Sequence, residues 1–290
     1  LPYRWLTSMM ARCDGSNLLI DVRRGDPDCF ERKRDGAPKP VVRDLFYTLS
    51  CGPYQWSSGF SLTMGNAERT EPVLLVGPKG LERVVGALRT IAPELPFPLV
   101  FKELTEPREK FQAGPYVVDA FRVNHRVTCY GYRITIPRNG KFDVERARAQ
   151  EIPQKFWSRL QKGETIEHEG RTLTPDMVLG EKRRGISVTY TTDTRPVPAI
   201  AEYAADNDLF ICEGMYGEKE KIANARENKH MMFQEAAKLG KEANPREMWL
   251  THYSPSLNRP DEFIDKVREI FPGAKTARDG WTRELTFDEE

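Results

Sequence analysis

Three side chains of metal-binding type follow predicted strands. Asp193 lies in TYTTDTRP, His252 in MWLTHYSP and His125 in FRVNHRV. Sites in open α/β folds assemble at strand ends, because rigid strands aim the side chains that follow them into one crevice. Two imidazoles and a carboxylate suit Zn²⁺ or Mn²⁺, so the pattern predicts a metal site. The alternative is structural: Asp193 caps a turn, His125 packs in a hairpin and His252 ends a strand.

A fourth candidate, His230, lies in ARENKHMMFQEAAKLG. Asn228 can act as a helix N-cap, which places His230 in the first turn, where free backbone N–H groups and the helix dipole favour anions. A histidine there would steady a phosphate oxygen; the alternative is an ordinary surface histidine. Glu213, just after LFIC, is either a carboxylate that supports the site or a surface charge at a strand end. We expect His168, in the polar stretch ETIEHEGRTL, to be solvated.

Strands and helices alternate from Asn66 onward, which indicates a layered α/β architecture. Runs of β-branched and aromatic residues predict strands, and apolar positions at helical spacing predict helices. The predicted strands cover residues 72–77, 97–104, 116–127, 130–137, 186–194, 209–215, 248–254 and 277–287. The predicted helices cover residues 81–92, 142–152, 199–207, 218–244 and 261–271.

The composition describes a globular chain. With 290 residues, 39% of them hydrophobic and 30% charged, it can form one domain over residues 1–290 and is neither disordered nor fibrous. No apolar run reaches the roughly 18 residues of a membrane helix. A net charge of +1 gives no general signal for nucleic acid, so any such site must be a local patch. The five cysteines stand singly without a CxxC pair, which argues against a disulfide framework or a thiolate zinc site and favours the cytoplasm.

Residues 22–61 stand apart from the rest of the sequence. This stretch begins with VRRGDPDCFERKRDGAPKPVVRD, which mixes charged residues and prolines. Its apolar residues follow neither the helical nor the strand period, which predicts a long loop. Loops of this length inside compact domains are uncommon. We expect reduced stability across residues 22–60, detectable as sensitivity to limited proteolysis.

The remaining segments together resemble ribonuclease Z, a branch of the metallo-β-lactamase superfamily. The resemblance covers most of residues 1–21 and 62–290. It implies an α/β fold of four layers, the αβ/βα sandwich, with two metal ions at one edge; the true N-terminal strand is expected to be missing, since the chain starts at Leu1. The motifs that carry the resemblance are LLIDV, LTMGNAERTEPVLLVGPKGLERVV, NHRVTCYGYRI, PRNGKFDVERA, TYTTDTRP, ICEGMYG, ENKHMMFQEAAKLGKEA and WLTHYSP.

The resemblance also implies a chemistry. It makes His125, Asp193 and His252 metal ligands, with Asp193 bridging two zinc ions, and makes His230 the group that stabilises the phosphate transition state. A bridging water made nucleophilic by the zincs cleaves a phosphodiester, typically at the 3′ end of pre-tRNA. The family further suggests a homodimer with RNA as its partner, and the lack of a long apolar run predicts no membrane association.

The family's main metal motif is absent. Where HxHxDH is expected, residues 46–60 read FYTLSCGPYQWSSGF, and VRRGDPD stands where CGEGTQ is expected. The chain has four histidines in all, so it keeps at most three of the family's ligands. Each zinc ion needs about four ligands, which permits one weakly held ion but no stable binuclear centre.

The genetic code links the anomalous stretch to the missing motifs. Read one nucleotide out of register, the codons from Tyr47 onward permit THYHADHISGLPG, and those from Val22 onward permit CGEGTQIA. Two family motifs in one register indicate a compensated frameshift, with a one-base insertion near Asp21 and its reversal near Phe60. Codons that cannot spell HYHADH in the shifted frame would rule this hypothesis out.

Three functions therefore compete. The first is a ribonuclease Z-like phosphodiesterase, the second a non-catalytic relative that binds RNA or a partner, and the third a hydrolase of the same fold acting on a small ester or cyclic phosphate. Metal content separates the first two, and trimming of a pre-tRNA trailer separates the first from the third. The chain shows no glycine- and proline-rich arm, but the basic residues 137–164 either contact RNA or form a solvated helix pair.

Overall fold

The computed structural model describes residues 7–13, 18–24, 46–48, 70, 72–90, 94–278 and 281–288. They fall into two compact units, the first within residues 1–135 and 187–286 and the second within residues 136–186 and 287–290. The single domain over residues 1–290 stays a prediction. In the part of the chain described, no helix has the length and apolar character needed to cross a membrane.

The first unit contains a seven-stranded sheet in the order β14-β13-β12-β11-β8-β7-β6. Strands β11 to β14 run parallel, and β6, β7 and β8 form an antiparallel meander. Thr191 pairs with Cys212 and Glu213 with Thr251, so the residues after β11, β12 and β13 emerge at one edge. The strands are β6 Arg108–Ala113, β7 Tyr116–Arg122, β8 Tyr130–Arg138, β11 Arg183–Thr191, β12 Leu209–Glu213, β13 Met248–Thr251 and β14 Ala274–Thr276.

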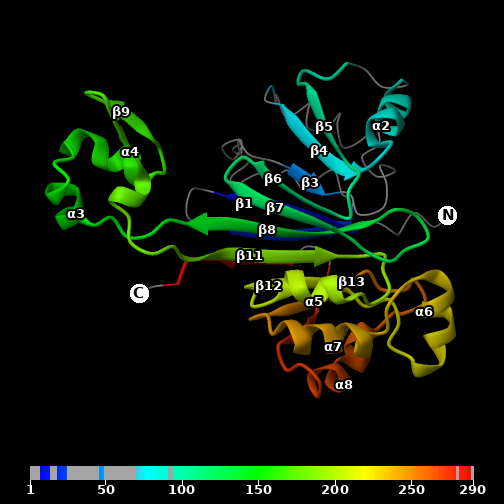
Figure 1. The fold of residues 1–290 in the computed structure, drawn as a ribbon. Helices are drawn as coiled ribbons and strands as arrows, with labels where there is room; N and C mark the ends of the chain where they lie inside the picture. Colours follow the sequence, from blue (N-terminus) through cyan, green and yellow to red (C-terminus); the bar gives the residue numbers. More distant parts are fainter. Residues whose placement is uncertain are drawn as a thin grey trace, which may run out of the picture. The chain divides into compact units, whose positions relative to one another are not determined.

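Three helices cover this sheet: α5 (Pro198–Ala204), α7 (Phe233–Ala243) and α8 (Ile264–Arg268). Helix α7 packs on β12, β13, α5 and α8, and Figure 1 shows the three helices on the same side of β12 and β13. Apolar residues spaced three or four apart on α7 are buried, which is the pattern of a helix with one face on a core. The same core includes Phe210 of β12 and Leu250 of β13.

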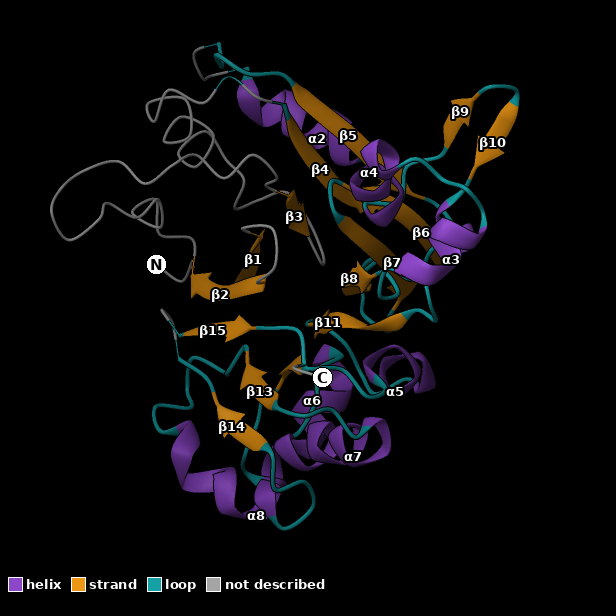
Figure 2. Ribbon diagram, turned by 90° about the vertical axis from the view of Figure 1, so that its left-hand side faces the viewer, coloured by secondary structure: helices purple, strands orange, loops and turns teal. Residues whose placement is uncertain are grey.

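The first unit also contains a six-stranded sheet in the order β15-β2-β1-β3-β4-β5. Helix α2 (Leu81–Arg89) packs on β4 and β5, which lie side by side in Figure 2. Val73, Leu75 and Val76 of β4 are fully buried. The strands are β1 Thr7–Cys13, β2 Leu18–Arg24, β3 Phe46–Thr48, β4 Val73–Pro78, β5 Leu99–Leu104 and β15 Thr282–Leu285.

The second unit is a small helical and hairpin segment with a core of its own. Helices α3 (Val144–Ala149) and α4 (Trp157–Gln161) pack with strands β9 (Ile166–His168) and β10 (Arg171–Leu173) around six buried side chains. The hairpin turn consists of Glu169 and Gly170, both with positive φ, as a two-residue turn requires. His168 is half-buried rather than solvated as predicted, because its ring packs edge-on against Phe156.

The long helical region predicted for residues 218–244 is wrong in one respect. It consists of a short 3₁₀ turn, α6 (Ile222–Asn228) and α7, with residues 229–232 between the two helices. Asn228 is the last residue of α6 and not an N-cap, because Lys229 adopts a left-handed conformation with φ of 63° and ends the helix. His230 therefore lies in a loop, and the predicted position in a first helical turn is wrong.

Other boundaries differ more modestly. The predicted strand 116–127 ends at Arg122, so His125 lies in the loop between β7 and β8. Strand β6 was not predicted, and the predicted terminal strand 277–287 contains only β15. Within residues 22–61 the structure has the end of β2 and the short β3. Most of that stretch, including the expected protease sensitivity, lies outside the described residues.

Candidate metal centre

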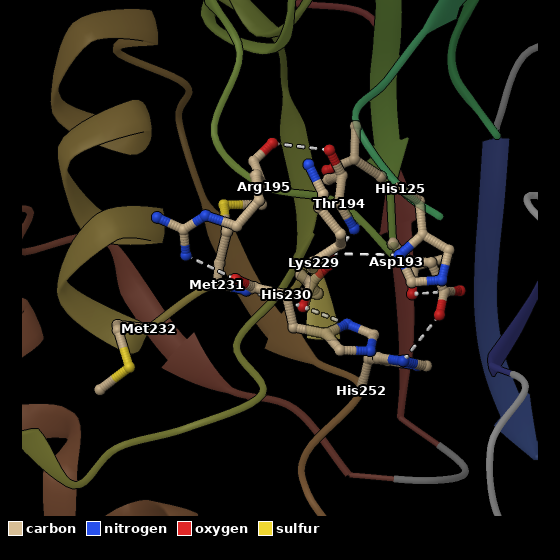
Figure 3. A network of polar contacts seen from close by, with 12 residues as sticks. His125, Asp193, Thr194, Arg195, Lys229, His230, Met231, Met232 and His252 are labelled. Carbon is tan, nitrogen blue, oxygen red and sulfur yellow. Dashed lines mark hydrogen bonds and ion pairs between the residues drawn. The ribbon is translucent and has the colours of Figure 1, made fainter. Parts of the chain in front are cut away.

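Asp193 and His252 lie at the ends of two strands of the seven-stranded sheet, β11 and β13, which flank β12. Asp193 follows β11 by two residues, and His252 directly follows β13. Both side chains are almost fully buried, and Nε2 of His252 lies 3.3 Å from Oδ1 of Asp193 (Figure 3). The strand ends thus bring together two candidate residues that are 59 positions apart in the sequence.

His125 and His230 approach the same point from two loops. Nδ1 of His125 lies 3.2 Å from the carbonyl oxygen of Lys229, and Nδ1 of His230 lies 3.1 Å from Oε2 of Glu213. The two ring centroids are 5.2 Å apart, and the ring of His230 lies 5.5 Å from that of His252. Nδ1 of each ring faces an oxygen acceptor, and a neutral ring that donates from Nδ1 presents the lone pair of Nε2 to a ligand.

The carboxylate of Glu213 connects the loops of the site through hydrogen bonds. It is the last residue of β12 and is completely buried. Its carboxylate accepts hydrogen bonds from the backbone N–H of Thr194, from His230 and from the backbone N–H of Met231, the last at 3.1 Å. Of the two possibilities for Glu213 raised by the sequence, the structure therefore supports the carboxylate that holds the site.

The donor set fits a single divalent ion. One ligand atom each from His125, Asp193 and His230 lie within 4.8 Å of one another. Both histidines have Nδ1 anchored on oxygen, which is the usual support of a metal-bound imidazole. With His252 beside Asp193, four side chains converge here, enough for the three protein ligands of a catalytic zinc ion and one further side chain that can contact a substrate. Two ions would need about twice as many ligands, so these residues do not fit a binuclear centre.

Cys212 precedes Glu213 but is unsuited to metal binding. Complete burial raises the pKa of its thiol, and Oγ1 of Thr191 donates a hydrogen bond to Sγ at 3.6 Å. The metal-binding form of cysteine is the thiolate, which this apolar site disfavours. Cys212 therefore belongs to the buried core next to the site.

Three residues at the site have left-handed backbone conformations that non-glycine residues rarely adopt. The φ angles are 52° for Asp193, 63° for Lys229 and 59° for His252. Such a conformation costs roughly 1–2 kcal/mol per residue and persists only where surrounding contacts impose it. The contacts of Glu213 and of the loops around it supply that restraint, as expected for a site whose geometry is fixed before a ligand arrives.

The structure brings together all four predicted site residues, His125, Asp193, His230 and His252. It also shows an ion pair that sequence reasoning missed, between Arg195 and Glu235. The sequence carries no local signal for this pair, because the partner lies 40 residues away.

Comparison with known proteins gives a consistent result. No family model matches the sequence. Ribonuclease Z of Lachnoclostridium phytofermentans is 54% identical over 289 residues, covering 99% of this chain and 94% of that protein. Ribonuclease Z of Lachnospira eligens is 52% identical over 290 residues, covering 100% of this chain and 95% of that protein.

Solved structures show the same fold at low sequence identity. Human tRNase Z, short form, aligns with a TM-score of 0.54 at 14% identity, covering 98% of this chain and all of that chain. Zn²⁺-bound PqqB from Methylobacterium extorquens aligns with a TM-score of 0.56 at 15% identity, covering 98% of this chain and 89% of that chain. The resemblance and the fold class predicted from the sequence are both confirmed: the chain belongs to the ribonuclease Z family and has the metallo-β-lactamase fold.

Proposed function

We propose that the chain carries the site of a metal-dependent phosphodiesterase, an endoribonuclease of the type that processes the 3′ end of tRNA. One observation carries the proposal: a carboxylate and two imidazoles lie within 4.8 Å of one another, with a further histidine 3.3 Å from the carboxylate. Ribonuclease Z relatives above 50% identity support the reaction class, and the structural similarity to human tRNase Z supports tRNA as the substrate.

Within this site we assign Asp193, His125 and His252 as metal ligands and His230 as the group that contacts the phosphate. Asp193 lies next to His252 and within reach of His125, which suits a central ligand. Among the residues that the structure describes, the donors at this site do not fit the family's two zinc ions, whereas they fit one zinc or manganese ion. A bound ion supplies an activated water and neutralises charge on the phosphate.

The role of His230 follows from its anchoring. Glu213 accepts from Nδ1, which fixes the ring and directs Nε2 to the side of Asp193 and His125. From there Nε2 can hydrogen-bond a phosphate oxygen of the substrate. Loss of one such fixed contact to a developing charge typically costs a factor of about 10²–10³ in rate. The loop position found for His230 serves this role through Glu213 rather than through a helix dipole.

The test is cleavage of a pre-tRNA with a labelled 3′ trailer, at saturating Zn²⁺ or Mn²⁺. We expect slow but measurable trimming that disappears in Asp193→Asn and persists in His168→Gln, the matched histidine control. Bis(p-nitrophenyl) phosphate and a 2′,3′-cyclic nucleotide form parallel arms. Turnover of these small esters without trimming would replace the RNA substrate with a small one.

A non-catalytic scaffold is the second candidate, and the sequence of residues 46–60 favours it, since the HxHxDH histidines and aspartate are missing there. It predicts less than one ion per chain and no turnover of any ester. A chain in which residues 22–60 are replaced by the shifted-frame sequence is the decisive comparison. Trimming that requires this replacement would identify the present chain as the inactive form.

Three further assignments belong to the proposal. The basic residues 137–164, in the second unit, are proposed as an RNA contact, testable by the salt dependence of tRNA binding. A homodimer is proposed from the family resemblance, testable by light scattering. A cytoplasmic location is proposed from the unpaired cysteines, testable by fractionation.

A further inference from the structure

We propose that Arg195 is a positioning residue that sets the relative placement of His125, Asp193 and His230 by joining the loops that carry them. What the site does once assembled rests on the proposed function. The assembly itself rests on contacts made by the backbone and the guanidinium of Arg195, and it is measurable without any turnover.

The first set of contacts joins the loop of Asp193 to the loop of His125. The backbone N–H of Arg195 donates to the carbonyl of Asn124 at 2.9 Å, and the two residues form an isolated antiparallel bridge. The hydroxyl of Thr194 accepts from the backbone N–H of Asn124 at 3.0 Å. Asn124 immediately precedes His125, so these bonds fix the backbone on which that imidazole stands.

The second set joins the loop of Asp193 to the loop of His230. Nη1 of Arg195 donates to the carbonyl oxygen of His230 at 2.6 Å (Figure 3). The same guanidinium forms a two-pronged pair with Glu235 in the first turn of α7, with one prong at 2.7 Å. Glu235 in turn accepts from the backbone N–H of Met232 at 2.9 Å. The guanidinium thus holds the loop 229–232 at both of its ends.

Burial makes this connection stiff. The side chains of Arg195 and Glu235 are only 16% and 22% exposed, so water replaces their hydrogen bonds poorly. A guanidinium presents its donors in a rigid planar fork, whereas a lysine offers a single point of charge on a flexible stem. Glu213 holds the ring of His230 and Arg195 holds its backbone, so the imidazole keeps its place only while both contacts persist.

The small number of histidines makes the placement directly observable. With four histidines in the chain, an imidazole ¹H–¹⁵N spectrum contains four sets of signals. Arg195→Met keeps the backbone bond to Asn124 and removes the guanidinium contacts to the loop 229–232. We therefore expect the signals of His230 to shift, and those of His125 to shift through its contact with the carbonyl of Lys229, while that of His168, in the β9–β10 hairpin, stays in place. A residue that only stabilised the fold would lower the unfolding midpoint and leave the spectrum of the folded state unchanged.

Zinc affinity, measured by competition with a chromophoric chelator, is the second readout. Loss of a contact that supports metal ligands typically weakens binding about 10- to 100-fold, which we expect for Arg195→Met. Arg195→Lys should recover part of this loss. Glu235→Gln, a milder change that keeps the bond to the His230 carbonyl, should weaken binding less.

Arg108→Met is the matched control. Arg108 forms a two-pronged pair with Glu202 at 2.7 Å in the same unit. This pair is exposed, and neither bond involves the loops that carry His125, Asp193 and His230. It should change neither the histidine signals nor the zinc affinity. Unchanged signals of His125 and His230 in both Arg195→Met and Glu235→Gln would overturn the proposal, as would an equal shift of His168. A chain that binds no zinc but shows the selective shift would contradict the proposed function and leave the positioning role standing.

Discussion

Replacing Glu213 with glutamine tests the support of the site most directly. The carboxylate is completely buried and accepts from three donors: two backbone N–H groups and the imidazole of His230. Glutamine keeps the shape, but only one of its two end groups can accept a hydrogen bond. Whichever way the amide turns, at least one buried donor faces an N–H group instead of an oxygen.

The size of the effect follows from the bonds that change. A hydrogen bond to a charged group contributes about 1.5–3 kcal/mol and a neutral one about 0.5–1.5 kcal/mol. Glu213→Gln removes at least one charged bond and converts the other two into neutral ones, a gross loss of about 4 kcal/mol. Removal of a buried charge offsets part of this loss, which leaves about 3 kcal/mol. A loss of that size lowers the unfolding midpoint by about 6 to 9 °C.

Thermal unfolding monitored by circular dichroism measures the shift. Glu202→Gln is the control, because Glu202 also pairs with two donors of one partner but is 53% exposed. Exposed pairs contribute about 1 kcal/mol or less, so the control should shift the midpoint by about 2 °C at most. Equal shifts in the two variants would refute the view that Glu213 is the buried anchor of the site.

Three shorter predictions concern the rest of the first unit. Two hydrogen bonds hold the pKa of Asp261 below its usual range: the bond from the hydroxyl of Thr276 has the larger effect, and the bond from the guanidinium of Arg278 the next. The folded state then binds a proton less readily than the unfolded chain, so this stabilisation is complete above the unfolded pKa and is lost as pH falls through the folded one. Asp261→Asn should therefore unfold at a lower midpoint than the parent at about pH 6, with a gap that narrows toward about pH 3. Gly131→Ala would place a Cβ 2.5 Å from the ring of Phe121, and we expect a loss of about 2 kcal/mol in urea unfolding. Burial raises the pKa of Cys212, so iodoacetamide should label this thiol only after denaturation, as mapped by mass spectrometry.

Sequence patterns located Asp193 and His252 well because both depend on a single rule. Parallel strands end at one edge of a sheet; the run that became β11 is rich in β-branched residues, and the run that became β13 is mostly large and apolar. The position of each residue relative to its strand end was therefore readable without knowing the rest of the fold. Glu213 followed from the same rule, although its burial could not be read from the sequence.

Sequence patterns failed where a local turn competes with a helical period. Residues 218–244 contain no glycine or proline before Gly240, and Lys229 gives no glycine signal for the left-handed turn that ends α6. The turn is imposed by tertiary contacts, among them the bond from Arg195 to the carbonyl of His230. Contacts between loops 35 to 40 residues apart leave no periodic trace in one sequence, which is why the pair of Arg195 and Glu235 was invisible.

The seven-stranded sheet supplies every loop on which the described candidate ligands lie. The lost motif instead falls at residues 46–60, which begin with β3 of the six-stranded sheet. The missing motif and the remaining candidate ligands thus belong to different segments of the chain. If the frameshift hypothesis holds, two compensating nucleotide changes would restore the ligands of the HxHxDH motif. The site formed by His125, Asp193, His230 and His252 is already in place to receive them. On that view the gene is repairable by undoing those two nucleotide changes, and no substitution among the surviving ligands is needed.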